Sequence, residues 1–313
     1  MYDRSLSLRR TPLALRLRHN FRRNKYIYIM ALPVIAYYLI FMYWPMYGAQ
    51  IAFKRFSPGR GILGSPWIGI SNYIKFFGSF YFGRIFRNTV LISVYGLVFS
   101  FPAPILLALM LNELRSVRFK RAVQTISYLP HFISIMVMCG MILDFTRSDG
   151  VINDMLGYFG LARQTMLLNP GMFRSIYIIS EVWQGIGWGS IIYLSALAGI
   201  DTEQYEAAVI DGAGRFQKML HVTLPGIAPT IVIMLILRVG QMMNVGYEKI
   251  ILLYNGNTYE TADVISTFVY RKGLVEADYS YSTAVGLFNS CINLCLLLVA
   301  NTVSRRVGET SLW

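Results

Sequence analysis

The stretch of sequence that decides the fold is NTVLISVYGLVFSFPAPILLALML, residues 88–111, which has 24 residues and no charged side chain. A helix needs about 20 mainly apolar residues to cross the hydrocarbon core of a bilayer. Within that core the backbone can hydrogen-bond only to other protein groups, so a run of this length forms a helix and not a loop or an open strand. Residues 88–111 therefore predict one transmembrane helix.

Five further stretches have the length and apolarity of a membrane crossing. They are residues 26–44, 122–143, 175–197, 227–245 and 282–303. The fourth and fifth crossings in chain order each contain one ionisable residue, Glu181 and Arg238 respectively. We therefore predict an all-α membrane protein with six transmembrane helices in residues 26–304.

The composition agrees with this class and indicates an orientation. Of the 313 residues, 55% are apolar and 14% are charged, against about 25% charged in soluble domains. The net charge of +13 would suggest nucleic-acid binding in a soluble protein, but in so apolar a chain it indicates cytoplasmic flanks of membrane helices.

With a cytoplasmic N-terminus, the inside segments contain 16 Lys and Arg residues and the outside segments 12. We therefore predict a multi-pass protein of a bacterial cytoplasmic membrane with both termini inside.

The two ends of the chain flank this transmembrane region. Residues 1–25 form a basic segment, and the apolar run after it is too long for the core of a signal peptide, so we expect it to be retained. Thr11-Pro12 can begin a surface helix in which apolar and basic residues alternate, although a disordered basic tail fits the same sequence. Residues 305–313 are a predicted cytoplasmic tail.

The sequence contains no recognisable catalytic, cofactor or metal motif. It has no Gly-Lys dipeptide and therefore no phosphate-binding loop, and its three histidines form no HExxH pattern. The three cysteines, Cys139, Cys291 and Cys295, all fall within predicted crossings, where small apolar packing residues are expected. We therefore predict that the chain is not an enzyme and binds no cofactor itself. Three classes remain: a secondary transporter, a membrane enzyme without a known motif, or the pore subunit of a complex with a separate motor.

The loop between the fourth and fifth crossings, GIDTEQYEAAVIDGAGRFQKMLHVTLPGIAPT, distinguishes these classes. Asp201 can cap a helix with Gln204 three positions later, and the alanines that follow favour helix. Glycines at 212 and 214 are expected to end it. The pattern predicts a short helix of small side chains, a second amphipathic piece at residues 216–222, and a boundary at Leu224-Pro225.

This loop resembles the EAA loop of the permease subunits of ATP-binding-cassette importers. The shared pattern is EAA-x2-DGA at residues 206–213, followed by ten residues and Leu224-Pro225, with Val222 where isoleucine is usual. The resemblance implies a type I importer architecture in which the loop, residues 201–225, sits in a groove of an ATPase subunit. ATP and Mg would then be bound by partner ATPase subunits. The implied coupling residues are Glu206, Ala207, Ala208, Asp211, Gly212, Ala213, Gly214, Phe216, Leu224 and Pro225.

Further stretches resemble the subgroup of these permeases that imports oligosaccharides and polysaccharide fragments, including alginate and pectin (rhamnogalacturonan). These stretches include YLPHFIS at 128–134, residues 46–69, and NVGYEKIILLYN at 244–255. The resemblance implies a heterodimer with a second permease, two ATPase subunits and an extracytoplasmic solute-binding protein. It also implies saccharide import by alternating access. The alternative is an ion-coupled secondary transporter, which would work without an ATPase and would be insensitive to changes at Glu206.

The two charges within the crossings are expected to meet. Glu181 lies six residues from the outer end of its crossing and Arg238 lies seven residues from the same surface, so their depths match. Charges inside a membrane are costly and normally pair in the protein interior. We therefore predict contact between Glu181 and Arg238, with a fixed ion pair or a substrate contact as the two possible roles.

A saccharide pathway needs aromatic ring faces with polar side chains beside them. The candidate residues for this pathway are Tyr177, Glu181, Trp183, Gln184, Trp188, Arg238, Gln241, Asn244, Tyr247 and Glu248. Tyrosine and tryptophan also anchor proteins at membrane interfaces, which leaves that role open for each aromatic residue. Gly185 and Gly189 form a GxxxG pair that is expected to allow close helix packing.

Overall fold

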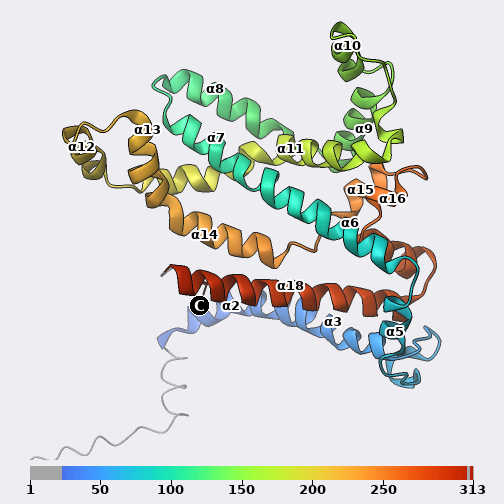
Figure 1. Ribbon diagram of the computed structural model, residues 1–313. Coiled ribbons are helices and arrows are strands. Elements are labelled where there is room, and N and C mark those ends of the chain that lie inside the picture. The colour runs from blue at the N-terminus through green and yellow to red at the C-terminus, as the bar shows by residue number, and fades with distance from the viewer. Residues whose placement is uncertain (1–22, 309–310, 313) are drawn as a thin grey trace, which may run out of the picture.

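The computed structural model describes residues 23–308, 311 and 312, so the predicted surface helix after Thr11-Pro12 lies outside the described residues. Within that part of the chain all regular elements are helical, apart from one isolated bridge between Lys54 and Trp67. The all-α class is therefore confirmed. Long helices lie roughly side by side, with short helices at both ends of the bundle (Figure 1).

The first long helix extends beyond its predicted end. It runs over Lys25–Phe53 and none of its apolar window is buried within this chain. α18 lies beside it (Figure 1). The first long helix consists of α2 (Lys25–Tyr37), η1 (Tyr38–Tyr43), α3 (Trp44–Met46) and η2 (Tyr47–Phe53). Its neighbour α18 spans Tyr279–Val307.

The second long helix, Phe82–Asn112, contains the predicted crossing at residues 88–111. It consists of α6 (Phe82–Tyr95), the π-helical turn η3 (Gly96–Ser100) and α7 (Pro102–Asn112). Proline has no N–H to donate and its ring clashes with the carbonyl four residues earlier. The wider π turn directly before Pro102 accommodates both effects, so the helix continues past the proline.

The predicted third crossing at residues 122–143 is wrong as a single straight helix. A first helical part ends at Phe132, a second begins at Ile135, and the two are bent by 103°. The break arises because Ile133 and Ser134 are extended and the Ser134 hydroxyl caps the new helix by accepting from the Val137 amide. The elements are α8 (Val117–Tyr128), η4 (Leu129–Phe132), α9 (Ile135–Thr146) and α10 (Val151–Tyr158), and α10 projects from the bundle (Figure 1).

The fourth predicted crossing lies within α11 (Pro170–Ala198), which Asn169 caps by accepting a hydrogen bond from the Gly171 amide. Of the predicted GxxxG pair, Gly189 packs closely, since a Cβ there would lie 2.9 Å from Pro104 Cγ, whereas Gly185 faces open space. Gly187 makes the closer approach, because its missing side chain leaves room for the backbone of α8 at Ser127. The GxxxG expectation is therefore confirmed at one of its two positions.

The predicted boundary at Leu224-Pro225 is wrong. A continuous helix of 26 residues runs from Arg215 to Gly240. Pro225 is interior to this helix, and the π turn just before it accommodates the missing N–H and the proline ring. The three elements are α13 (Arg215–Lys218), η6 (Met219–Thr223) and α14 (Leu224–Gly240).

The fifth crossing ends earlier than predicted, at Gly240 and not at residue 245. The chain turns there because α18 holds it: the Met243 amide donates to Asn293 Oδ1, and the side-chain amides of Asn289 and Asn293 both donate to Asn244 Oδ1. Residues 241–245 are therefore a turn at the end of the helix, outside the crossing.

Four described helices have the length and apolarity to cross a membrane, and five if the bent pair counts as one. α11 is 29 residues long but more polar than these. The predicted number of six crossings therefore stays a prediction. The remaining elements are α4 (Gly61–Gly64), α5 (Ser71–Phe77), η5 (Met166–Leu168), α12 (Thr202–Ile210), α15 (Tyr247–Leu253), α16 (Tyr259–Ala262), α17 (Ile265–Tyr270) and η7 (Arg271–Val275).

Candidate functional site

The loop between α11 and α14 forms the predicted short helix, α12. Asp201 caps it as expected, because its carboxylate accepts a hydrogen bond from the Glu203 amide at 3.0 Å. The helix ends at Ile210, and Gly212 follows in a turn with a φ of +76°, a left-handed conformation that glycine adopts without strain. None of the described residues of α12 is buried. The helix lies at the opposite end of the molecule from α10, α15 and α16 (Figure 1).

The small residues of α12 border a hollow of about 450 Å³ that α13 and η6 complete. Five of the ten predicted coupling residues line it: Ala207, Ala208, Asp211, Gly212 and Ala213. The other five lie around it.

Of those five, Glu206 and Phe216 are exposed, and the amide of Gly214 donates to Gln217 Oε1 at 2.8 Å. Leu224 packs against an apolar cluster of α7, α11 and α14, and Pro225 faces a groove toward α18. The structure thus brings half of the predicted set to one concave surface.

One residue of the loop was missed by sequence reasoning. The Tyr205 hydroxyl lies 3.1 Å from Thr223 Oγ1, which joins α12 to the last turn before α14. Thr223 is buried and Tyr205 is half-buried. A tyrosine beside Glu206 was visible in the sequence, but no pattern there gives its partner 18 residues away.

The predicted meeting of the two intramembrane charges is confirmed. Arg238 Nη2 lies 2.9 Å from Glu181 Oε1, and the Ser100 hydroxyl donates to Glu181 Oε2 at 3.2 Å. Both charged side chains are partly exposed, at 43% for Arg238 and 31% for Glu181. With Gln241 they line a cavity of about 340 Å³ between α7, α11 and α14.

The other pathway candidates divide into two groups. Tyr177 and Asn244 border a smaller hollow of about 50 Å³ on which Glu181, Arg238 and Gln241 also open. The remaining candidates lie apart from these two cavities. They are Trp183, half-buried Gln184, exposed Glu248, Trp188, which stacks on His131, and Tyr247, which stacks on Tyr270.

Lys249 is a buried charge that sequence reasoning did not select. It is 5% exposed, its Nζ donates to the Tyr177 carbonyl at 3.4 Å, and it lies 4.8 Å from the centre of the Tyr177 ring. Burial lowers the pKa of Lys249 from 10.5 to about 8, and the nearby Glu181 acts in the opposite direction.

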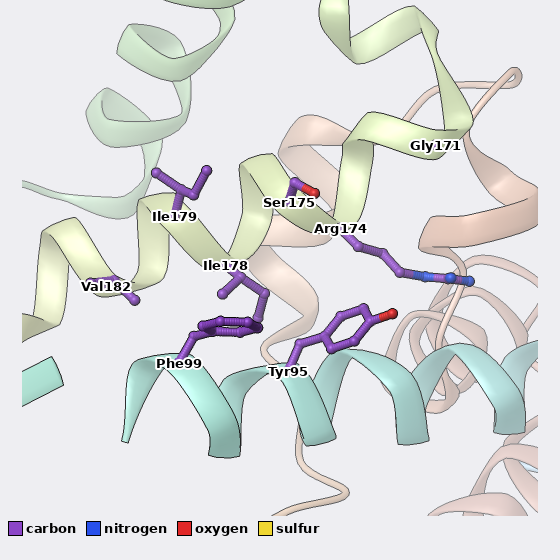
Figure 2. Close-up of a pocket in the computed structure, with 8 residues that line it drawn as sticks. All are labelled: Tyr95, Phe99, Gly171, Arg174, Ser175, Ile178, Ile179 and Val182. Carbon is purple, nitrogen blue, oxygen red and sulfur yellow. The ribbon is translucent and has the colours of Figure 1, made fainter. Parts of the chain in front are cut away.

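A third cavity, of about 580 Å³, lies between the second long helix and the first half of α11 (Figure 2). It is lined by Tyr95, Phe99, Gly171, Arg174, Ser175, Ile178, Ile179 and Val182. Within the described residues, no group of three or more His, Cys, Asp and Glu side chains could hold a metal ion.

Comparison with known proteins identifies the family of this chain. Residues 100–309 match the family described as binding-protein-dependent transport system inner membrane component, which is more than half of the chain. The chain belongs to this family. It is therefore the permease subunit of an importer, and neither an enzyme nor the subunit that hydrolyses ATP. The resemblance to permeases of ATP-binding-cassette importers is confirmed, and the alternative of a secondary transporter is not favoured.

Two relatives and one solved structure are similar over almost their whole length. The chain is 42% identical to the polygalacturonan/rhamnogalacturonan transport system permease protein YteP of Bacillus subtilis (strain 168), over 93% of this chain and 91% of that protein. It is 41% identical to LplB of the same organism, over 93% and 92%. A chain in the crystal structure of a bacterial alginate ABC transporter, in complex with an alginate pentasaccharide-bound periplasmic protein, aligns with a TM-score of 0.88 and 46% identity, covering 95% of this chain and 100% of that one.

Proposed function

We propose that this chain is the pore subunit through which fragments of an acidic polysaccharide enter a bacterial cell. The proposal is supported by the similarity to a polygalacturonan/rhamnogalacturonan permease and to a transporter involved in import of the acidic polysaccharide alginate. The proposed complex also contains a second, related permease, two ATPase subunits that hold ATP and Mg, and an extracytoplasmic solute-binding protein. Residues 26–304 are its permease domain, and both termini face the cytoplasm.

The main support for the proposed mechanism is that the exposed helix α12 is joined to a transmembrane helix. α12 presents a hollowed surface of small residues, which a partner protein can approach closely. The bond between Tyr205 and Thr223 connects α12 to the continuous helix that ends at Gly240. The sequence has no nucleotide-binding loop of its own, and the family is that of importer permeases, so we propose that the energy enters from a bound ATPase and that α12 is the point of entry.

The proposed saccharide path follows the polar cavities of the bundle. The Glu181–Arg238 pair and Gln241 line the larger of the two central cavities, and Tyr177 and Asn244 extend the polar surface beside the pair. Alternating access would expose this surface first to the solute-binding protein and then to the cytoplasm.

Changing Glu206 tests the proposed docking surface. Glu206 is exposed on α12, so Glu206→Lys is expected to leave the bundle folded while reversing a charge toward the ATPase. We expect a loss of at least tenfold in saccharide-stimulated ATP hydrolysis by the reconstituted complex. Glu203→Lys is the matched control, since Glu203 is also exposed and lies one turn earlier on the same helix.

Equal stimulation in the Glu206→Lys variant and the wild type would contradict the docking role of α12. Saccharide uptake by the wild-type chain without any ATPase subunit would instead support the secondary-transporter alternative.

A further inference from the structure

The third cavity, at the end of α11 remote from α12, combines two aromatic rings with one positive charge in a mostly apolar lining. Tyr95 and Phe99, one turn apart on the second long helix, face α11 across the cavity (Figure 2). Their rings offer flat apolar faces of the kind on which pyranose rings stack. Arg174 lies at the outer end of the same cavity.

Arg174 is held in place by neutral groups. Its Nη2 donates to Asn88 Oδ1 at 2.7 Å, and its Nε donates to the Thr261 carbonyl at 3.3 Å. No carboxylate lies within ion-pair distance of Arg174 in the part of the chain that the structure describes, although Glu260 and Arg87 are close enough to act on it electrostatically. Its orientation is therefore fixed while its charge stays unneutralised by direct contact.

The neighbouring arginines show what a neutralised site looks like in this protein. Arg84 and Arg271 both contact the fully buried Asp263, at 3.2 Å and 2.9 Å. The chain thus pairs two of the arginines around this end of the bundle with a carboxylate of its own. Arg174 lacks such a contact, so an external anion would neutralise its charge as Asp263 neutralises the charges of Arg84 and Arg271.

The location of this cavity favours a transported ligand. Residues 171–182 of α11 line the cavity at Arg174, and residues 181–193 line the cavity at the Glu181–Arg238 pair, so the two follow one another along α11. Arg174 and Glu181 are seven residues apart, or about 10 Å along a helix. A chain of sugar residues leaving the cavity at Arg174 would therefore reach the cavity at the Glu181–Arg238 pair.

We propose that this cavity binds a uronate residue of the transported saccharide, with Arg174 as the contact for its carboxylate and Tyr95 and Phe99 as the surface for its ring. An arginine guanidinium suits a carboxylate because it donates parallel hydrogen bonds in a planar arrangement. The proposal rests on the function proposed above and deepens it, because it names the residue that distinguishes acidic from neutral saccharides within the permease.

The test uses the complete reconstituted transporter and two trisaccharides that differ only in charge. One is an oligogalacturonate trimer, and the other is the neutral trimer made by reducing its carboxyl groups to alcohols. For Arg174→Gln we expect the apparent KM for uptake of the acidic trimer to rise about tenfold, as for loss of a charged hydrogen bond. Arg174→Lys should recover part of this loss. Arg163→Gln is the control, because Arg163 pairs with Asp154 on an exposed segment away from the cavity, and its uptake should equal that of the wild type.

A second measurement on the wild-type protein keeps the proposal testable if Arg174→Gln does not fold. Arginines of the transporter without its solute-binding protein are modified with phenylglyoxal and quantified by mass spectrometry. The acidic trimer should protect Arg174 and leave Arg163 reactive, while the neutral trimer should protect neither.

The outcomes separate this inference from the function on which it rests. Unchanged KM for the acidic trimer in a folded Arg174→Gln variant, or equal protection by both trimers, would overturn the uronate site alone. Protection of Arg174 by anionic phospholipid vesicles in place of the acidic trimer would also overturn it, in favour of a lipid. Failure of the wild-type complex to import either trimer would overturn the proposed function as well.

Discussion

At the scale of single residues, the Glu181–Arg238 pair shows what a sequence can reveal about a membrane protein. Each residue is the only charge in its predicted crossing, and counting from the predicted outer ends places both at one depth. The contact is present although α14 ends at Gly240, two residues after Arg238, and not at the predicted residue 245. The cost of an unpaired charge in a membrane then makes contact the expected arrangement. Ser100, the third member of the cluster, could not be found this way, because a serine in a membrane helix is not costly enough to require a partner.

A double-mutant cycle measures the strength of this pair. We expect Glu181→Gln and Arg238→Gln each to lower the free energy of unfolding in detergent, because each leaves its partner unpaired. The double variant should lose less than the two single losses together, with a coupling of about 1 kcal/mol, since both side chains are partly exposed. Strictly additive losses would contradict a direct interaction.

Lys249 predicts a dependence of stability on pH. Its pKa is about 8 in the folded protein and 10.5 when unperturbed, so between these values the unfolded chain binds more protons than the folded one. Stability therefore rises as the pH increases through this range and carries the full penalty below it, roughly 3 kcal/mol for this difference in pKa.

Lys249→Met removes that penalty while keeping an unbranched side chain. We expect the variant to have a higher thermal midpoint than the wild type at pH 7, and the difference between them to shrink by pH 9.5. Comparing the two proteins at each pH cancels the titration of all shared groups. A difference that is independent of pH would show that Lys249 does not titrate in this range.

At the scale of elements, the helix ends were harder to predict than the helices. A proline commonly ends a helix, yet Pro102 and Pro225 both lie inside continuous helices because a π turn precedes each of them. The break in the third crossing arises at the Ser134 cap, which resembles any serine in the sequence. The early end of α14 depends on Asn289 and Asn293, which are remote in the chain and carry no local signal.

The crossing of α8 and α11 depends on one glycine. A Cβ on Gly187 would overlap the Ser127 carbonyl and lie 2.9 Å from the Tyr128 amide nitrogen, so Gly187→Ala must separate two backbones. We expect a loss of stability of about 1–3 kcal/mol, as for other overpacked sites, measured as a lower thermal midpoint in detergent. Gly185→Ala, two residues earlier on α11, has open space around it and should be neutral or stabilising. Equal effects of the two substitutions would contradict the close contact.

At the scale of the whole molecule, most of the outer surface of this chain is suited to lipid or protein and not to water. The apolar window of the first helix, Lys25–Phe53, has no buried residue within this chain, and its tyrosines, isoleucines and methionines are largely exposed. The sequence predicted the class and the coupling loop, because apolarity, length and a spaced motif are local properties. It could not place the cavities at Arg174 and at the Glu181–Arg238 pair, since each is formed by helices that are far apart in the chain.

The continuous helix from Arg215 to Gly240 connects the α12 end of the molecule to the Glu181–Arg238 pair. Its 26 residues correspond to a length of about 39 Å along the helix axis. A π turn and Pro225 lie at the junction of α13 and α14, which are positions where helices commonly bend, and α13 and α14 run in different directions (Figure 1). The Tyr205–Thr223 contact joins α12 to this turn. A displacement of α12 would act on this turn first and would reach Arg238, two residues before the end of α14, where Arg238 contacts Glu181 of α11. The salt bridge between α14 and α11 would thus be one of the contacts that change when the proposed ATPase partner displaces α12.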